Sequence, residues 1–64
     1  MATNTEVRTA QKSELYDLLM LKKEIEKDSA GYKALIRLIN KKEAAMEAED
    51  VAYVEKKIAE LDNN

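Results

Sequence analysis

The chain has no cysteine, no histidine and no proline, and it holds a single glycine, Gly31, among its 64 residues. Without cysteine it cannot form a disulfide framework, and without cysteine or histidine it cannot build the common zinc sites. A domain of this length buries only a small core, so small proteins usually gain stability from a disulfide, a metal or another chain. The composition therefore favours association with another chain, and we predict no cofactor and no metal.

Side chains suited to catalysis are also scarce. Ser13 and Ser29 cannot have a histidine as general base, because the chain contains none. Carboxylate pairs such as Glu43 and Glu47 are typical of exposed helix surfaces rather than of acid–base dyads. We therefore expect a protein that is not an enzyme.

The residues that are present are those of helical proteins. Charged residues make up 38% of the chain and apolar residues 45%, and the three aromatic residues are all tyrosine. A mixture rich in Ala, Glu, Lys and Leu is typical of long helices and coiled coils. No apolar run approaches the length of a membrane span, and the polar N-terminal segment is unlike a signal peptide. We predict a single all-α domain in the cytoplasm without membrane contact, with residues 1–5 and 62–64 as polar tails.

One segment of the sequence carries residues that commonly end one helix and begin the next. Apolar residues recur at helical spacing from Val7 to Ile25, and the segment 28–31, with the sequence DSAG, follows. Gly31 can end a helix in the left-handed conformation, while Asp28 or Ser29 can cap the next helix. The alternative is a glycine tolerated inside one long helix, at a cost of ~1 kcal/mol. We predict that the chain turns near Ser29–Gly31.

Beyond this turn, an apolar stripe continues from Tyr32 to Leu61 without losing its helical phase. The stripe favours one helix of roughly thirty residues, ~45 Å long. The alternative is a break near Asp50, where Asp50 would cap a short third helix. Folding the two arms together places apolar residues opposite each other, for example Ile25 opposite Leu35. We therefore predict an antiparallel two-helix hairpin.

A two-helix hairpin covers only one side of each helix. Val54, Ile58 and Leu61 would lie beyond the end of the first arm, with no apolar partner in their own chain. Exposed apolar surface on this scale usually marks an interface. We expect the chain to form an oligomeric helical bundle, such as a four-helix bundle, with the following interface residues: Leu19, Ile36, Leu38, Val54, Ile58 and Leu61.

Charge is distributed unevenly along the sequence. Residues 22–42 carry seven cations and three anions, a balance of +4, whereas residues 43–64 carry two cations and seven anions, a balance of −5. The turn end of the hairpin is therefore basic and the open end acidic. Lys22 and Lys42 fall inside the apolar stripes, where a lysine usually lays its stem along the core and keeps its ammonium in water. The alternatives are a lysine that sets the register or the oligomeric state at some loss of stability, and a lysine that binds a ligand.

These features predict a homo-oligomeric protein that binds a macromolecular partner. We expect this partner to be a protein, and this chain to act as its inhibitor or as an adaptor. The alternative is a phosphate-bearing ligand, RNA or a small nucleotide, bound at the basic turn end. The sequence pI of about 5.1 disfavours nucleic acid. The candidate partner or ligand contacts are Tyr16, Lys23, Lys27, Lys33, Arg37 and Lys41.

Overall fold

A computed structural model describes residues 4–63, and all of its regular structure is helical. Helix α1 spans Asn4–Glu24, α2 spans Ala30–Ala44 and α3 spans Ala48–Asp62. The prediction of an all-α fold is confirmed. The prediction of a continuous second helix is wrong, because the segment after the turn forms two helices of 15 residues each.

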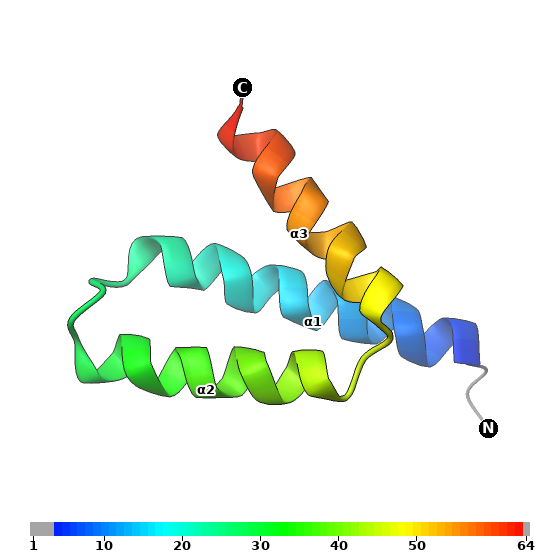
Figure 1. The fold of residues 1–64 in the computed structure, drawn as a ribbon, viewed down its shortest axis with the longest axis horizontal. Coiled ribbons are helices and arrows are strands. Elements are labelled where there is room, and N and C mark those ends of the chain that lie inside the picture. The colour runs from blue at the N-terminus through cyan, green and yellow to red at the C-terminus, as the bar shows by residue number, and fades with distance from the viewer. Residues whose placement is uncertain (1–3, 64) are drawn as a thin grey trace.

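Helix α1 is the element against which the other two helices pack. In Figure 1, α1 runs from the N-terminal end on the right toward the left, α2 returns beside it, and α3 crosses α1 and leads away toward the C-terminus. Helices α2 and α3 each contact α1 and have only slight contact with each other. Helix α2 therefore lies beside α1, whereas α3 leaves α1 at an angle, so that α2 and α3 diverge from one another (Figure 1).

The core is small and lies where all three helices meet. Leu15 of α1 is fully buried at its centre, in a cluster with Leu35 and Ile39 of α2 and Val54 of α3. Leu35 and Ile39 are four positions apart and so lie on one helix face. Partly buried apolar residues surround this cluster: Tyr16, Leu18, Leu19, Ile25, Met46 and Val51.

The first connection comprises residues 25–29, so the chain turns just before the predicted position. Ser29 is the N-cap of α2, and its Oγ accepts a hydrogen bond of 3.1 Å from the Tyr32 backbone N–H. Capping by Ser29 is confirmed. The role predicted for Gly31 is wrong, because Gly31 lies in the first turn of α2 and does not have a positive φ. The serine cap ends the connection without a left-handed residue.

The second connection comprises residues 45–47, three residues before the break that was considered near Asp50. Glu47 takes the N-cap position of α3 with extended backbone, and its side chain makes no capping hydrogen bond. Its carbonyl accepts from the backbone N–H groups of Asp50 and Val51. Asp50 therefore lies inside the first turn of α3 and is not its cap.

The ends of the helices shorten the predicted tails. Because α1 begins at Asn4 and α3 ends at Asp62, residues 4, 5 and 62 are helical. The remaining tail residues 1–3 and 64 lie outside the described residues. Within residues 4–63, no helix combines the length and the apolar character needed to cross a membrane.

Candidate functional site

A buried carboxylate joins the start of α3 to α1. The Asp50 side chain is only 6% exposed. Arg8 Nε donates to Asp50 Oδ2 at 2.8 Å, and Arg8 Nη2 donates to Asp50 Oδ1 at 2.9 Å and to Glu49 Oε1 at 2.6 Å. A guanidinium matches a carboxylate in such a two-point contact.

The same contact shifts the pKa values of both Arg8 and Asp50. The hydrogen bonds from Arg8 lower the pKa of Asp50, although burial of the carboxylate acts in the opposite direction. The hydrogen bond to Asp50, followed by that to Glu49, raises the pKa of Arg8 further above its usual value. Both groups are therefore charged at neutral pH, and a lone buried Asp50 would be costly. The arrangement is structural: it fixes the point where α3 crosses α1.

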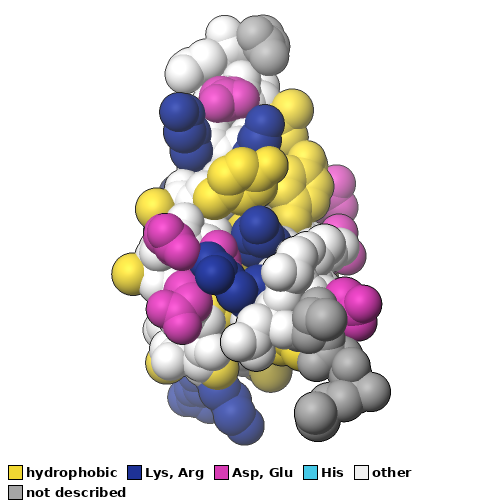
Figure 2. All heavy atoms as spheres, turned by 90° about the vertical axis from the view of Figure 1, so that its right-hand side faces the viewer, with side chains coloured by type: hydrophobic (Ala, Val, Ile, Leu, Met, Phe, Trp, Pro, Cys, Tyr) yellow, Lys and Arg dark blue, Asp and Glu magenta, His cyan; other side chains and the backbone are white. Residues whose placement is uncertain are grey.

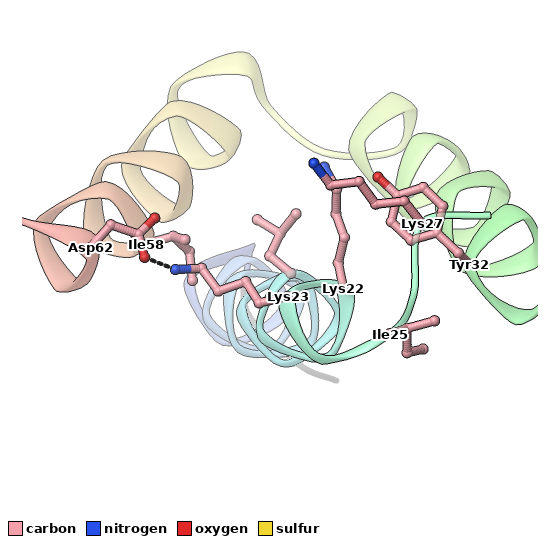
Figure 3. Close-up of a pocket in the computed structure, with 8 residues that line it drawn as sticks. Lys22, Lys23, Ile25, Lys27, Tyr32, Ile58 and Asp62 are labelled. Atoms are coloured by element: carbon pink, nitrogen blue, oxygen red, sulfur yellow. Dashed lines mark hydrogen bonds and ion pairs between the residues drawn. The ribbon is translucent and has the colours of Figure 1, made fainter. Parts of the chain in front are cut away.

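A groove of about 320 Å³ opens over the C-terminal half of α1, where α2 and α3 diverge. We call it the three-helix groove. Figure 3 shows α1 at its base, with α3 on one side and α2 on the other. Its lining residues are Leu19, Lys22, Lys23, Ile25, Lys27, Tyr32, Ile58 and Asp62.

The polar side chains of the three-helix groove are mostly cationic. Lys22 and Lys27 point into the space between α2 and α3, and Tyr32 extends toward them from α2 (Figure 3). Lys23 turns the other way and forms an ion pair with Asp62 at the end of α3. Within residues 4–63, neither the Lys22 nor the Lys27 ammonium has a carboxylate within 4.0 Å. The groove therefore combines an apolar base with two ammonium groups that have no anionic partner in the described chain.

A second groove of about 330 Å³ follows the seam between α1 and α2, and we call it the α1–α2 groove. Leu18, Leu38 and Ala45 supply its apolar lining, with Lys41 and Lys42 at its edge. Leu38 is 56% exposed, the most exposed of the large apolar side chains. Lys42 forms an ion pair with Glu14 across this seam, and its side chain is 26% exposed.

Tyrosine side chains line the contact between α1 and α3. The Tyr53 ring is 52% exposed, with the ammonium groups of Lys12 and Lys57 at 4.9 Å and 5.5 Å from its centroid. Tyr16 is half-buried against the core. Figure 2 shows hydrophobic side chains gathered in the upper half of this face, the level of α3 in Figure 1, with Lys and Arg beside them. Cations above an exposed ring are favourable contacts, and they leave part of the Tyr53 ring accessible.

The structure places the six predicted interface residues differently. Leu38 and Leu61 are exposed, whereas Leu19, Ile36 and Ile58 are partly buried. Val54 is 2% exposed and belongs to the core of its own chain. The premise that Val54 lacks an apolar partner is therefore wrong, because the break at residues 45–47 folds α3 onto Leu15.

The predicted basic contacts are not brought together in one place. Lys23 and Lys27 line the three-helix groove, and Lys41 lines the α1–α2 groove. Lys33 and Arg37 are exposed on α2 and line none of these grooves. Lys22, for which a ligand-binding role was the third interpretation of its place inside the α1 stripe, lines the three-helix groove.

The described residues offer little for metal or acid–base chemistry. In the part of the chain that the structure describes, no group of three or more Asp or Glu side chains is arranged to hold a metal ion. Asp50, the one carboxylate within residues 4–63 with a clearly shifted pKa, accepts two hydrogen bonds from Arg8. The grooves are therefore candidates for binding.

Comparisons of this chain with protein families, with curated proteins and with solved structures find no significant match.

Proposed function

We propose that this chain is a non-enzymatic helical protein of the cytoplasm that assembles with copies of itself and binds a protein partner as an inhibitor or adaptor. In this proposal α1 and α2 form an antiparallel hairpin, α3 packs across it, and further chains complete a helical bundle.

The supporting observation is the surface left open by the diverging helices. The chain exposes 4976 Å², whereas a compact monomer of the same mass exposes ~4,200 Å². The chain is therefore less compact than a typical monomer of its mass. The radius of gyration is 12.5 Å, compared with ~10.7 Å for a compact domain of this length.

The exposed side chains have the chemistry of an interface. Among residues 4–63, five large apolar residues are 45% exposed or more: Val7, Leu21, Leu38, Tyr53 and Leu61. Leu38 lines the α1–α2 groove, and Tyr53 lines a third groove, of about 230 Å³, between α1 and α3. A partner side chain can insert into each of them. Large apolar or aromatic side chains in contact with such pockets carry much of the affinity of protein interfaces.

Light scattering and a capture experiment test the two parts of the proposal. Light scattering at micromolar concentration should give a mass of at least twice 7.3 kDa; a folded species of 7.3 kDa would contradict self-association. Capture from lysate should retain a protein partner after nuclease treatment. A Leu38→Ser variant should lose that partner, whereas the matched exposed change Ala34→Ser should keep it.

The second candidate function is binding of a phosphate-bearing ligand, RNA or a small nucleotide. The observation that favours it is a pair of ammonium groups, those of Lys22 and Lys27, that point into the three-helix groove and have no carboxylate of residues 4–63 within 4.0 Å. Phosphate binding weakens steeply with salt, whereas apolar contacts do not. Nuclease-sensitive capture that is lost when Lys22 and Lys27 are changed to Gln would support this function at the three-helix groove, whereas loss on changing Lys33, Arg37 and Lys41 to Gln would place it on α2. If that triple variant retained every binding activity, the predicted basic end would be excluded.

A further inference from the structure

Helices α1 and α2 share a face that α3 leaves open. Helix α3 lies on the side of α1 that carries Lys12 and Tyr16, which line the groove between α1 and α3. Leu18 and Leu21 lie roughly 150° around α1 from Tyr16, at ~100° per residue. Leu18 lines the α1–α2 groove together with Leu38 of α2. We call this side of α1 and α2, which faces away from α3, the back face.

The back face presents apolar side chains without a partner in the same chain. Leu21 is 46% exposed and Leu38 is 56% exposed. Leu18 is half-buried beside them, and Ala45, the residue that follows α2, is exposed. Within residues 4–63, α3 supplies none of the residues that line the α1–α2 groove. Apolar surface of this kind is typical of a contact with another chain.

The charged residues that border the back face where α1 and α2 run side by side are anions on α1 and cations on α2. Those without an ion pair within residues 4–63 are Asp17, Glu24, Lys33, Arg37 and Lys41. All five are exposed. The remaining two, Glu14 and Lys42, pair with each other across the seam between the helices. Two back faces turned toward each other can therefore place the anions of α1 against the cations of α2.

The register between α1 and α2 determines where these charges would meet. Glu14 lies level with Lys42, with which it forms an ion pair. Helix α2 returns along α1 (Figure 1), so each step toward the end of α1 corresponds to a step toward the start of α2. Asp17 therefore lies level with the turn of α2 between Arg37 and Lys41.

We infer that the back face is the contact between two copies of this chain, related by a two-fold axis parallel to the helices, so that α1 of each copy lies over α2 of the other. Leu18 and Leu38 of both copies then form one central apolar layer. Asp17 of each copy lies between Arg37 and Lys41 of the other, where it makes charge-assisted contacts. This inference rests on the self-association proposed above and assigns its surface.

Charge selects this axis over the other two-fold axis that a face-to-face dimer allows. An axis across the helices would lay α1 on α1 and α2 on α2. Asp17 would then meet Asp17 of the second copy, and the cations of α2 would meet their own counterparts, so that like charges repel. The axis parallel to the helices brings opposite charges together at both contacts. It also gives each helix two neighbours that run in the opposite direction, as in a four-helix bundle.

Helix α3 lies outside this contact. Tyr53 and Leu61 therefore stay exposed in the dimer and are available to the protein partner or to further chains. Leu38 is covered by the second copy instead. The Leu38→Ser variant would then lose the protein partner through loss of the dimer.

Paired charge reversals test this inference on the full chain. The α1 variant is Asp17→Lys, and the α2 variant is Arg37→Glu with Lys41→Glu. Each variant alone places like charges together at both contacts of the dimer, so its self-association should weaken by more than about tenfold. An equimolar mixture restores opposite charges at both contacts and should form a mixed dimer, which native mass spectrometry would detect.

Matched controls make the same charge changes away from the back face. The control for the α1 variant is Glu55→Lys, and the control for the α2 variant is Lys27→Glu with Lys56→Glu. All three residues are exposed and have no ion pair within residues 4–63. Both controls should keep the wild-type mass.

The outcomes separate this inference from the proposed function. Loss of association in each variant, with rescue in the mixture and helicity retained by circular dichroism, would support the assignment of the back face. If the wild type associated but neither variant lost mass, self-association would stand and this assignment would be overturned. Variants that kept their mass but lost a captured protein would assign the back face to that protein instead. A folded wild type of 7.3 kDa would overturn both the inference and the proposed self-association.

Discussion

Arg8 and Asp50 are 42 positions apart in the sequence, yet the guanidinium of one donates two hydrogen bonds, of 2.8 and 2.9 Å, to the carboxylate of the other. The contact fixes the first turn of α3 against the first half of α1. It lies beside the core residue Val54, so the charged pair and the apolar contact hold the same helix crossing. The direction in which α3 leaves α1, and with it the three-helix groove, depends on this crossing.

Acid should weaken the fold through Asp50. Arg8 lowers the pKa of this carboxylate in the folded chain, so the folded state binds its proton less readily than the unfolded state does. The stabilisation is complete above the unfolded pKa of about 3.9 and is lost as the pH falls through the folded pKa. We expect the melting temperature to fall as the pH drops below about 4.

The Asp50→Asn variant is the matched test of that dependence. It keeps the size of the side chain but leaves Arg8 without its charged partner, so it should melt at a lower temperature than wild type at pH 7. Between pH 4 and pH 2 it should lose less stability than wild type does. Identical acid profiles for the two proteins would assign the acid sensitivity to other carboxylates.

The Ser29→Ala variant should lose the side-chain cap of α2. In the wild type, the Ser29 Oγ accepts a hydrogen bond from the Tyr32 backbone N–H. Removal of such a cap lowers the free energy of unfolding by about 0.5–2 kcal/mol. Urea denaturation should show this as a lower midpoint with an unchanged slope. Ser13→Ala, a change of the same kind at an exposed position in the middle of α1, should leave the midpoint within error or raise it.

Gly31→Ala should stabilise the protein, because Gly31 has ordinary helical backbone in the first turn of α2. A Cβ at this position would meet only Ser29 Oγ, at 3.9 Å, which is an ordinary van der Waals contact. Alanine at a compatible glycine position adds about 0.4–1 kcal/mol. A destabilised Gly31→Ala variant would favour the left-handed turn that the sequence predicted.

The α3 stripe should divide into a core residue and an interface residue. Val54→Ala should lower the free energy of unfolding by about 2 kcal/mol at any protein concentration, because Val54 is buried beside Leu15. Leu61→Ser changes an exposed residue, so in a dilute sample its free energy of unfolding should stay within about 0.5 kcal/mol of the wild-type value. At high concentration it should reduce the assembled fraction. If both variants lowered the free energy of unfolding equally at every concentration, Val54 and Leu61 would not have the different roles assigned here.

The sequence predicted the elements that depend on local signals. The apolar stripes indicated helices, and Ser29 indicated a cap, because both properties arise within a few residues. The break at residues 45–47 lacks such a signal, since no glycine or proline occurs there and the apolar phase continues through it. It is stabilised by contacts distant in sequence, namely Arg8 with Asp50 and Leu15 with Val54.

The candidate site could also be predicted only in part. Lys23 and Lys27 could be predicted as part of a basic end, because charge can be counted along the chain. Their separation from Lys33 and Arg37 could not be predicted, since it depends on how α2 faces α1. The three-helix groove forms between α2 and α3 because these helices diverge. A two-helix hairpin has no third helix, so the predicted fold could not contain this groove.

Thermal melting as a function of protein concentration tests most directly whether association stabilises this fold. A chain that folds as part of an assembly gains stability by mass action, so its melting temperature rises with concentration. Between about 5 and 500 μM, we expect the circular dichroism midpoint to rise by several degrees, with the Ile58→Ser, Leu61→Ser double variant showing a smaller rise. A midpoint that stays constant over this range, together with a mass of 7.3 kDa, would contradict the account.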